Sequence, residues 1–147
     1  MKRIFYVLPF LLALYMGCGP SSNTPTPTSS LPLGTFTGPY TYVHTHFNTG
    51  VKDTTRGSLQ LSVENATGYS VTGDTSKHAG SYGACYVNPS TGYINFVDKT
   101  APASGTPAKI HLNGLYLYSY DGTNFQLQQE GALDTTAIIY NLKKTGS

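Results

Sequence analysis

The chain has 147 residues, of which 39% are hydrophobic, 12% aromatic and only 11% charged. This length excludes two ordinary domains joined by a linker, and the apolar content excludes a chain that is disordered throughout. Two of the nine basic residues precede Cys18, so seven basic residues face seven acidic ones in the rest of the chain. A neutral chain without a basic block gives no electrostatic reason to expect nucleic-acid binding.

Residues 1–17 are predicted to be a signal peptide. Residues 2–3 are basic, residues 4–16 form an apolar stretch, and the small residue Gly17 stands before Cys18. The apolar stretch is too short to cross a bilayer core of about 30 Å as a helix. The arrangement resembles a bacterial lipoprotein signal, which is cleaved before a cysteine that then becomes acylated; ordinary secretion is the alternative. Acyl chains on Cys18 would give a stable membrane anchor.

Residues 18–32 read as a flexible tether, because Pro, Ser and Thr dominate and residues 19–30 contain no large apolar side chain. The tether would hold the folded part away from the membrane. The leader resembles those of Bacteroidetes lipoproteins, in which an acidic cluster after the cysteine tends to mark surface display. None follows Cys18 here. The expected location is therefore the cell envelope, at the outer membrane and facing the periplasm, with surface display as the alternative.

Residues 33–147 are expected to form one all-β domain. Short runs of Tyr, Val, Ile, Leu, Phe and Thr alternate with Gly, Asn, Asp and Pro, and no helical stripe interrupts them. Short turns between successive strands favour an up-and-down meander, and closing it into an eight-stranded barrel removes the exposed edges. A β-sandwich is the alternative. The expected strands are residues 35–47, 56–64, 68–73, 80–87, 93–97, 109–120, 124–129 and 136–143.

Four segments carry a resemblance to small lipocalin-like lipoproteins of Bacteroidetes: residues 34–40 (GTFTGPY), 92–98 (GYINFVD), 112–118 (LNGLYLY) and 139–144 (IYNLKK). The resemblance covers nearly all of residues 34–144. It implies a calycin-type barrel, a fold that often holds a small apolar ligand. Two Asp-Thr-Thr triplets also resemble the O-glycosylation acceptor pattern of these bacteria, with Thr54 and Thr135 as the acceptors.

Side-chain alternation predicts what the interior contains. The clean pattern of the second strand places Leu59 and Leu61 inside, and the first strand places Phe36, Tyr40 and Tyr42 on one face. An eight-stranded barrel has room either for packed side chains or for one small ligand, and both interpretations stay open. Walls of tyrosine would suit a mostly apolar ligand with a polar edge. The candidate ligand-binding residues are Tyr40, Tyr42, His44, Leu59, Leu61, Phe96 and Tyr116.

His44 and His46 stand two apart on the first expected strand, with Cβ atoms about 7 Å apart on one side, a spacing that can chelate a transition metal. A closed zinc site needs four ligands, and the remaining His and Cys residues are scattered. Histidines near a strand end are more often polar rim residues. The sequence therefore predicts no metal and no other cofactor.

The residues that often carry catalysis have simpler explanations. Cys85 is the one thiol left once Cys18 is acylated, and it is expected to be a small buried hydrophobe. Phosphate-binding loops, nucleophile elbows and helical metal motifs are absent from the sequence, so an enzyme is not expected. Five acids stand singly at or beside expected turns, where a carboxylate accepts backbone hydrogen bonds: Asp53, Asp74, Asp98, Asp121 and Asp134.

Two functions follow. The first is a membrane-anchored envelope lipoprotein whose barrel binds a small, mostly hydrophobic molecule. The second is a structural lipoprotein, an accessory subunit whose exposed tyrosines contact another envelope protein or a glycan. A cavity lined by the candidate residues would favour the first function, and a filled barrel with a tyrosine patch would favour the second.

Overall fold

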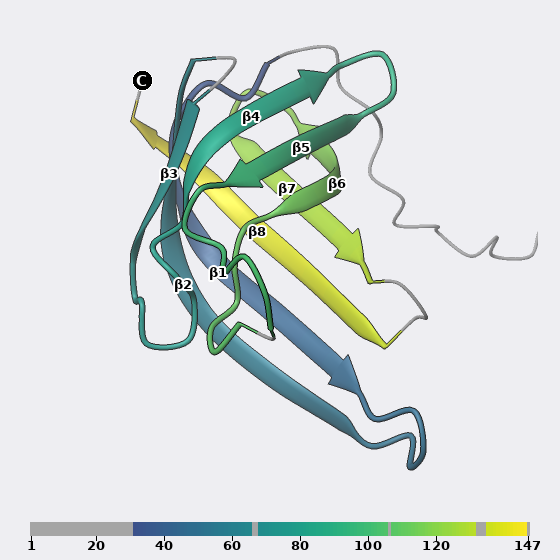
Figure 1. Ribbon diagram of the computed structural model, residues 1–147. Helices are drawn as coiled ribbons and strands as arrows, with labels where there is room; N and C mark the ends of the chain where they lie inside the picture. Colours follow the sequence, from purple (N-terminus) through teal and green to yellow (C-terminus); the bar gives the residue numbers. More distant parts are fainter. Residues whose placement is uncertain (1–30, 66–67, 106, 132–134, 147) are drawn as a thin grey trace, which may run out of the picture.

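The structure is a computed structural model that describes residues 31–65, 68–105, 107–131 and 135–146 (Figure 1). The predicted signal peptide and all but the last two residues of the predicted tether lie outside these ranges. Within them no helix is long and apolar enough to cross a membrane. The strands are β1 (Gly34–Thr45), β2 (Lys52–Asn65), β3 (Gly68–Gly73), β4 (Tyr82–Asn88), β5 (Tyr93–Asp98), β6 (Gly114–Tyr120), β7 (Asn124–Glu130) and β8 (Thr136–Gly146).

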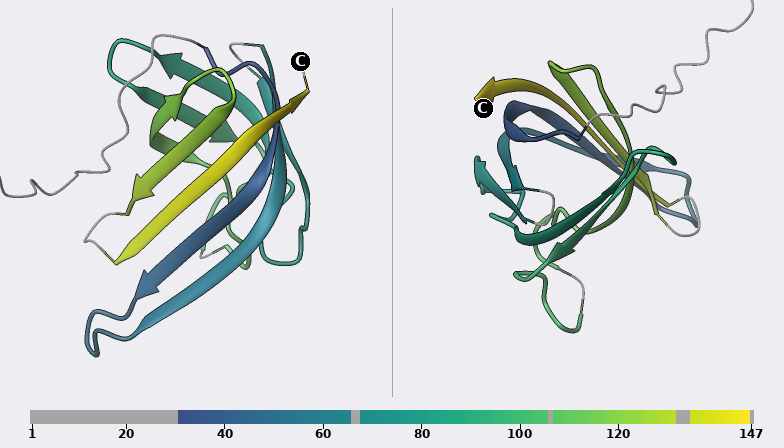
Figure 2. Two further views of the ribbon diagram at one scale, coloured as in Figure 1. Left: turned by 180° about the vertical axis from the view of Figure 1, so that it is seen from behind. Right: turned by 90° about the horizontal axis from the view of Figure 1, so that it is seen from above.

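The strands close into one barrel. Each strand pairs antiparallel with the next along the chain, and β8 returns to lie beside β1 (Figure 2). In this last pairing Tyr140 is opposite Tyr40. The predicted all-β, eight-stranded up-and-down barrel is therefore confirmed, and the sandwich alternative is wrong. All eight expected strands are present, because strand propensity and turn residues agree along the whole domain.

Two strands begin at positions that the pattern does not predict. β2 starts at Lys52 and not at residue 56, because residues 52–55 pair with the end of β1 in a long hairpin. β6 starts at Gly114 and not at residue 109. Gly114 has a φ of 93°, which favours glycine, and it marks the point where the chain enters the sheet. Before it, Ile110 forms an isolated parallel bridge with His78.

The interior is filled by side chains over most of its length. Leu59, Leu61 and Phe96 are buried, as the alternation predicts. Aromatic rings form two contacting groups, one around Phe36 and Phe125 and the other around the middle of the barrel. The buried aromatic residues are Phe36, Tyr40, Tyr69, Phe96, Tyr116, Tyr118, Tyr120, Phe125 and Tyr140.

The two ends of the barrel differ. The end that holds the start of β1 also carries the short turn between β6 and β7 and the end of β8. The opposite end carries the β1–β2 hairpin and the two longest described loops, residues 74–81 and 99–113 without residue 106. The hairpin projects past β3, which pairs with β2 only as far as Leu59, and its tip also projects past β8, which pairs with β1 as far as His44 (Figure 1).

Candidate ligand-binding site

A pocket of about 530 Å³ opens at the loop-bearing end of the barrel. This volume is within the range of small-molecule sites, about 300–1,000 Å³. Its walls come from five strands, β1, β2, β6, β7 and β8, and from the two long loops, so residues distant in sequence meet here. The lining residues are Tyr42, Thr55, Lys77, Ala101, Pro102, Pro107, Ala108, Lys109, Ile110, His111, Asn113, Tyr116, Gln129 and Ile138.

Tyr116 lines this pocket, and its hydroxyl is the group best suited to bind a ligand. The residue is 1% exposed, and its hydroxyl has no hydrogen bond of acceptable geometry to any described residue. Burial raises the pKa of Tyr116, and the Tyr140 hydroxyl and the Asn113 backbone are near enough to lower that pKa in part. A buried polar group without a partner costs about 1–3 kcal/mol. The hydroxyl is therefore available to a ligand that offers a hydrogen-bonding group.

His78 joins one of the pocket loops to the barrel interior. Its Nδ1–H donates to the Ala79 carbonyl at 2.7 Å, which leaves Nε2 to accept from the Tyr140 hydroxyl at 3.0 Å. The imidazole also packs against the Tyr40 ring, with centroids 5.3 Å apart. Burial lowers the pKa of His78, so the neutral ring is favoured. This network holds the loop against the aromatic core.

Asp98 holds the other loop. Its carboxylate accepts from the Thr100 backbone and hydroxyl, both at 2.7 Å, and from His111 Nδ1 at 2.7 Å. Burial raises the pKa of Asp98, but the hydrogen bonds from Thr100, His111 and Ser81 outweigh it and leave that pKa below its ordinary value. The carboxylate therefore stays charged and fixes both ends of the loop at the pocket.

The two lysines that line the pocket are cationic. Lys77 and Lys109 line it, while no acidic side chain is among its described lining residues. The Lys109 ammonium donates to the Thr75 carbonyl at 2.6 Å, which places it at the rim. Apolar surface comes from the loop prolines and alanines together with Ile110 and Ile138. The lining therefore combines apolar, uncharged polar and cationic side chains.

A larger hollow, of about 770 Å³, lies against the sheet formed by β6, β7, β8 and β1 at the other end of the barrel. Several of its polar side chains are already paired, as in the bond from Gln126 to Asn141 at 2.8 Å. Asp121 accepts from Thr123 and Asn124 in its turn. Because the hollow contains no buried polar group without a partner among the described residues, the loop-end pocket is the better candidate site.

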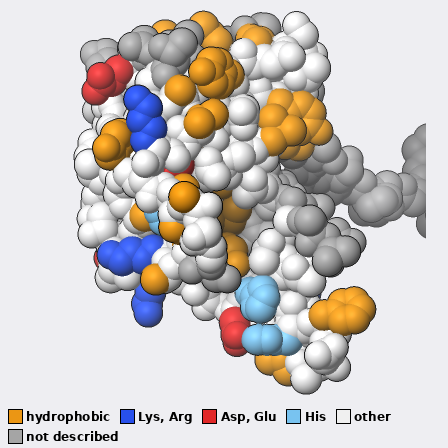
Figure 3. Space-filling model, viewed as in Figure 1, with side chains coloured by type: hydrophobic (Ala, Val, Ile, Leu, Met, Phe, Trp, Pro, Cys, Tyr) orange, Lys and Arg blue, Asp and Glu red, His pale blue; other side chains and the backbone are white. Residues whose placement is uncertain are grey.

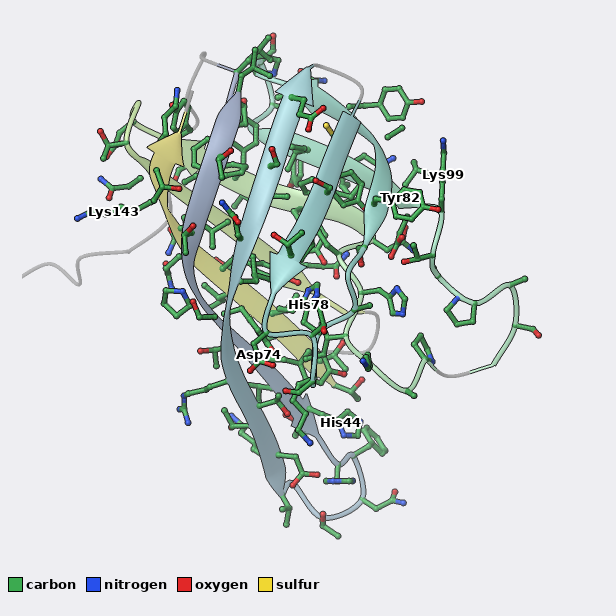
Figure 4. The ribbon with its side chains drawn as sticks, turned by 90° about the vertical axis from the view of Figure 1, so that its left-hand side faces the viewer. His44, Asp74, His78, Tyr82, Lys99 and Lys143 are labelled. Atoms are coloured by element: carbon green, nitrogen blue, oxygen red, sulfur yellow. The ribbon has the colours of Figure 1, made fainter. Side chains whose placement is uncertain are left out.

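The ligand-binding residues that the sequence predicts lie in three different parts of the structure. Tyr42 and Tyr116 line the pocket. Tyr40, Leu59, Leu61 and Phe96 belong to the packed core instead. His44 lies on β1 in the long hairpin (Figure 4) and is not among the lining residues.

Sequence patterns did not indicate most of the pocket. Ile138 sits on an expected strand, but its position at the pocket depends on closure between β8 and β1. His78 and residues 99–108 have no periodic pattern in the sequence. The one available signal was the pair of prolines, Pro102 and Pro107, which marked a long connection. Its place over the barrel end is set by contacts distant in sequence.

No family model, curated protein or solved structure matches this chain. The architecture itself, a closed eight-stranded antiparallel barrel, is calycin-like. Functional inference therefore depends on the geometry of the pocket and on the chemistry of its lining.

The remaining sequence expectations have mixed outcomes. Cys85 is fully buried, and burial raises its pKa to about 11, so it is a thiol and not a thiolate at neutral pH. Asp74, Asp98 and Asp121 accept backbone hydrogen bonds as expected. The expectation is wrong for Asp53, which lies within β2 and accepts from a histidine. Asp134, in the second glycosylation triplet, lies outside the described residues; Thr54 is exposed on β2.

Proposed function

We propose that this protein is an envelope lipoprotein that binds a small, mostly hydrophobic molecule in the pocket at the loop-bearing end of its barrel. The observation that carries the proposal is the buried Tyr116 hydroxyl, which lines the pocket and has no hydrogen bond among the described residues. A ligand that supplies this partner would offset the cost of burying the group.

The lining also favours one ligand chemistry. Prolines, alanines and isoleucines suit an aliphatic or ring-shaped body, and Tyr42 adds an aromatic wall. Lys77 and Lys109 would attract a carboxylate or another anionic end. Amphipathic acids such as long-chain fatty acids and bile acids combine both properties, and quinones offer a neutral comparison.

The position of the pocket fits a tethered protein. β1 begins at Gly34, at the end of the barrel opposite the pocket (Figure 1). If acylated Cys18 anchors the chain through residues 18–32, the pocket would face away from the membrane. A ligand would then enter from the aqueous compartment, which we propose to be the periplasm.

Replacing Tyr116 with Phe is expected to weaken ligand binding about 3- to 10-fold, since one hydrogen bond contributes about 0.5–1.5 kcal/mol. Stability should stay the same or increase slightly, because the hydroxyl has no hydrogen-bond partner among the described residues. The ligand is first sought by native mass spectrometry of protein purified from its own host. Its affinity, or that of a fatty acid, is then measured by isothermal titration calorimetry.

Tyr120→Phe is the matched control, because the Tyr120 hydroxyl donates to the Gly122 carbonyl at 2.9 Å at the opposite end of the barrel. This variant should bind the ligand as the unmodified protein does. Equal weakening in both variants, or no binding of any co-purified or added compound, would argue against the pocket.

An apolar outer face supports the second candidate function, contact with another envelope protein. Side chains on neighbouring positions of β4, β5 and β6 point outward, and Figure 3 shows hydrophobic side chains gathered over β4 and β5. The exposed members are Tyr82, Tyr86, Tyr93, Val97 and Leu115. Failure to find a ligand, together with a co-purifying envelope protein that is lost when Tyr82 and Tyr86 become Ser, would favour this function.

Cys18→Ser is expected to move the protein from the membrane fraction to the soluble fraction of the host, because the acyl chains would be absent. Mass spectrometry of the unmodified protein should show an N-terminal Cys18 that carries acyl groups. Fractionation with immunoblotting provides the readout. A mature protein that begins elsewhere, or carries an unmodified Cys18, would leave ordinary secretion as the explanation.

A further inference from the structure

Three metal-ligating side chains meet on the projecting hairpin. His44, His46 and Asp53 each offer one ligand atom, and these atoms lie within 4.8 Å of one another. His46 Nε2 is 2.7 Å from Asp53 Oδ2, and the two imidazole rings have centroids 4.8 Å apart. In the described part of the chain, no other group of three such residues is this close.

The register of the hairpin builds this cluster. His44 on β1 is the direct cross-strand partner of Asp53 on β2, so both side chains project from the same face. His46 follows two residues later, and its backbone N–H donates to the Val51 carbonyl at 2.8 Å, which continues the ladder into the turn. The three side chains are therefore positioned by paired backbone and not by a mobile loop.

An ordinary ion pair would not explain all three residues. His46 and Asp53 could form a surface pair alone, and such pairs contribute about 0–1 kcal/mol. His111 and Asp98 form a two-residue pair elsewhere in the barrel, where the Asp98 side chain is fully buried. In the hairpin, a second imidazole is brought edge to face against the first, with its ligand nitrogen directed to the same small volume.

We propose that His44, His46 and Asp53 bind one divalent transition-metal ion. Two imidazole nitrogens and a carboxylate oxygen match the preferences of Zn²⁺ and its neighbours, whereas Mg²⁺ and Ca²⁺ prefer oxygen ligands alone. Metal bonds of about 2.0–2.2 Å need ligand atoms roughly 3–3.5 Å apart. Small side-chain rotations achieve this, because His46 and Asp53 are exposed.

Three protein ligands leave a position open on the metal. Tyr42 and Thr55, which line the ligand pocket, are the next cross-strand pair that projects from this face of the hairpin. The open position is therefore near the pocket entrance, and water or an anionic ligand could fill it. The metal site itself does not depend on the pocket being occupied.

The test is calorimetric titration of the purified full-length protein, without a histidine tag, with Zn²⁺. We expect one ion per chain, and at least 10-fold weaker binding in each of the variants His44→Ala, His46→Ala and Asp53→Ala. Mg²⁺ should give no comparable binding. Circular dichroism melting of the variants without metal checks that the barrel still folds, as expected for residues on a projecting hairpin.

His111→Ala is the matched control, because it removes a histidine that also faces an aspartate but belongs to no three-residue cluster. It should bind Zn²⁺ as the unmodified protein does. The proposal is overturned if Zn²⁺ does not bind, if the combined His44→Ala and His46→Ala variant binds it equally well, or if His111→Ala loses it.

Discussion

Replacing Phe125 with Ala is expected to lower the free energy of unfolding by about 3–5 kcal/mol, the range for a large aromatic side chain removed from a packed core. Phe125 is completely buried on β7. Its ring contacts those of Phe36, Tyr118 and Tyr120, with centroids 5.0 Å, 6.1 Å and 6.0 Å away. Whole-domain stabilities are commonly only about 5–15 kcal/mol, so this loss would be severe.

Chemical denaturation followed by tyrosine fluorescence gives the measurement. Phe47→Ala is the control, because Phe47 is 87% exposed in the turn of the hairpin, and it should change stability by less than about 0.5 kcal/mol. A similar small effect for Phe125→Ala would mean that this end of the barrel is not packed as described.

The protein is expected to lose stability as the pH falls below about 6.5, because the folded state disfavours protonation of His78. Burial lowers the pKa of this residue and outweighs the hydrogen bond to the Ala79 backbone, which raises that pKa; His111 adds a smaller lowering and Asp98 a smaller raising effect. Protonation would also place a donor on Nε2, where the neutral ring accepts from the Tyr140 hydroxyl. The hydrogen bond that holds the loop to the core would then be lost in its present form.

The sign follows from proton linkage. Between the lowered pKa of the folded state and the ordinary histidine value of about 6.5, the unfolded chain binds more protons than the folded one. The stability that depends on neutral His78 is therefore fully present above that ordinary value. It is lost as the pH falls from the ordinary value to the lowered pKa of the folded state. For this one residue, the free energy of unfolding changes by at most about 1.4 kcal/mol for each pH unit.

Urea denaturation at pH 7.5, 6.5, 5.5 and 5.0 measures this slope. His78→Gln should be less stable at neutral pH but should lose the part of the slope that comes from His78. Asp98 and Asp121 contribute little in this window, because the pKa of Asp98 is lowered and that of Asp121 is lowered to about 2 by hydrogen bonds from Asn124 and Thr123. An unchanged slope in the variant would contradict the role given to His78.

The hairpin and the long loop are two segments whose backbone structure the sequence pattern does not predict. The residues at 52–55, which precede the expected second strand, have no apolar alternation, yet they form strand because β1 pairs with them. Residues 109–113 have strand-like composition but lie outside β6, because Ile110 forms an isolated bridge with His78. In both cases a distant partner, and not local preference, decides the backbone.

The same contrast applies to the candidate sites. The sequence identified Tyr42 and Tyr116 by strand alternation, because inward positions can be counted along a strand. It could not separate them from Tyr40 and Phe96, which are also inward but packed. It paired His44 with His46 by their spacing, but Asp53 joins them only through the register of the hairpin.

The sequence by itself determined the all-β class, the number of strands, the inward face of most strands and the expectation of a lipid anchor at Cys18. Each of these depends on local composition or on a repeat of two residues, which is readable along the chain. The tertiary structure decided which part of the barrel is filled, where the pocket opens, how His78 is buried and which residues form the metal cluster. Those features depend on barrel closure and strand register, which bring together side chains that are far apart in the sequence.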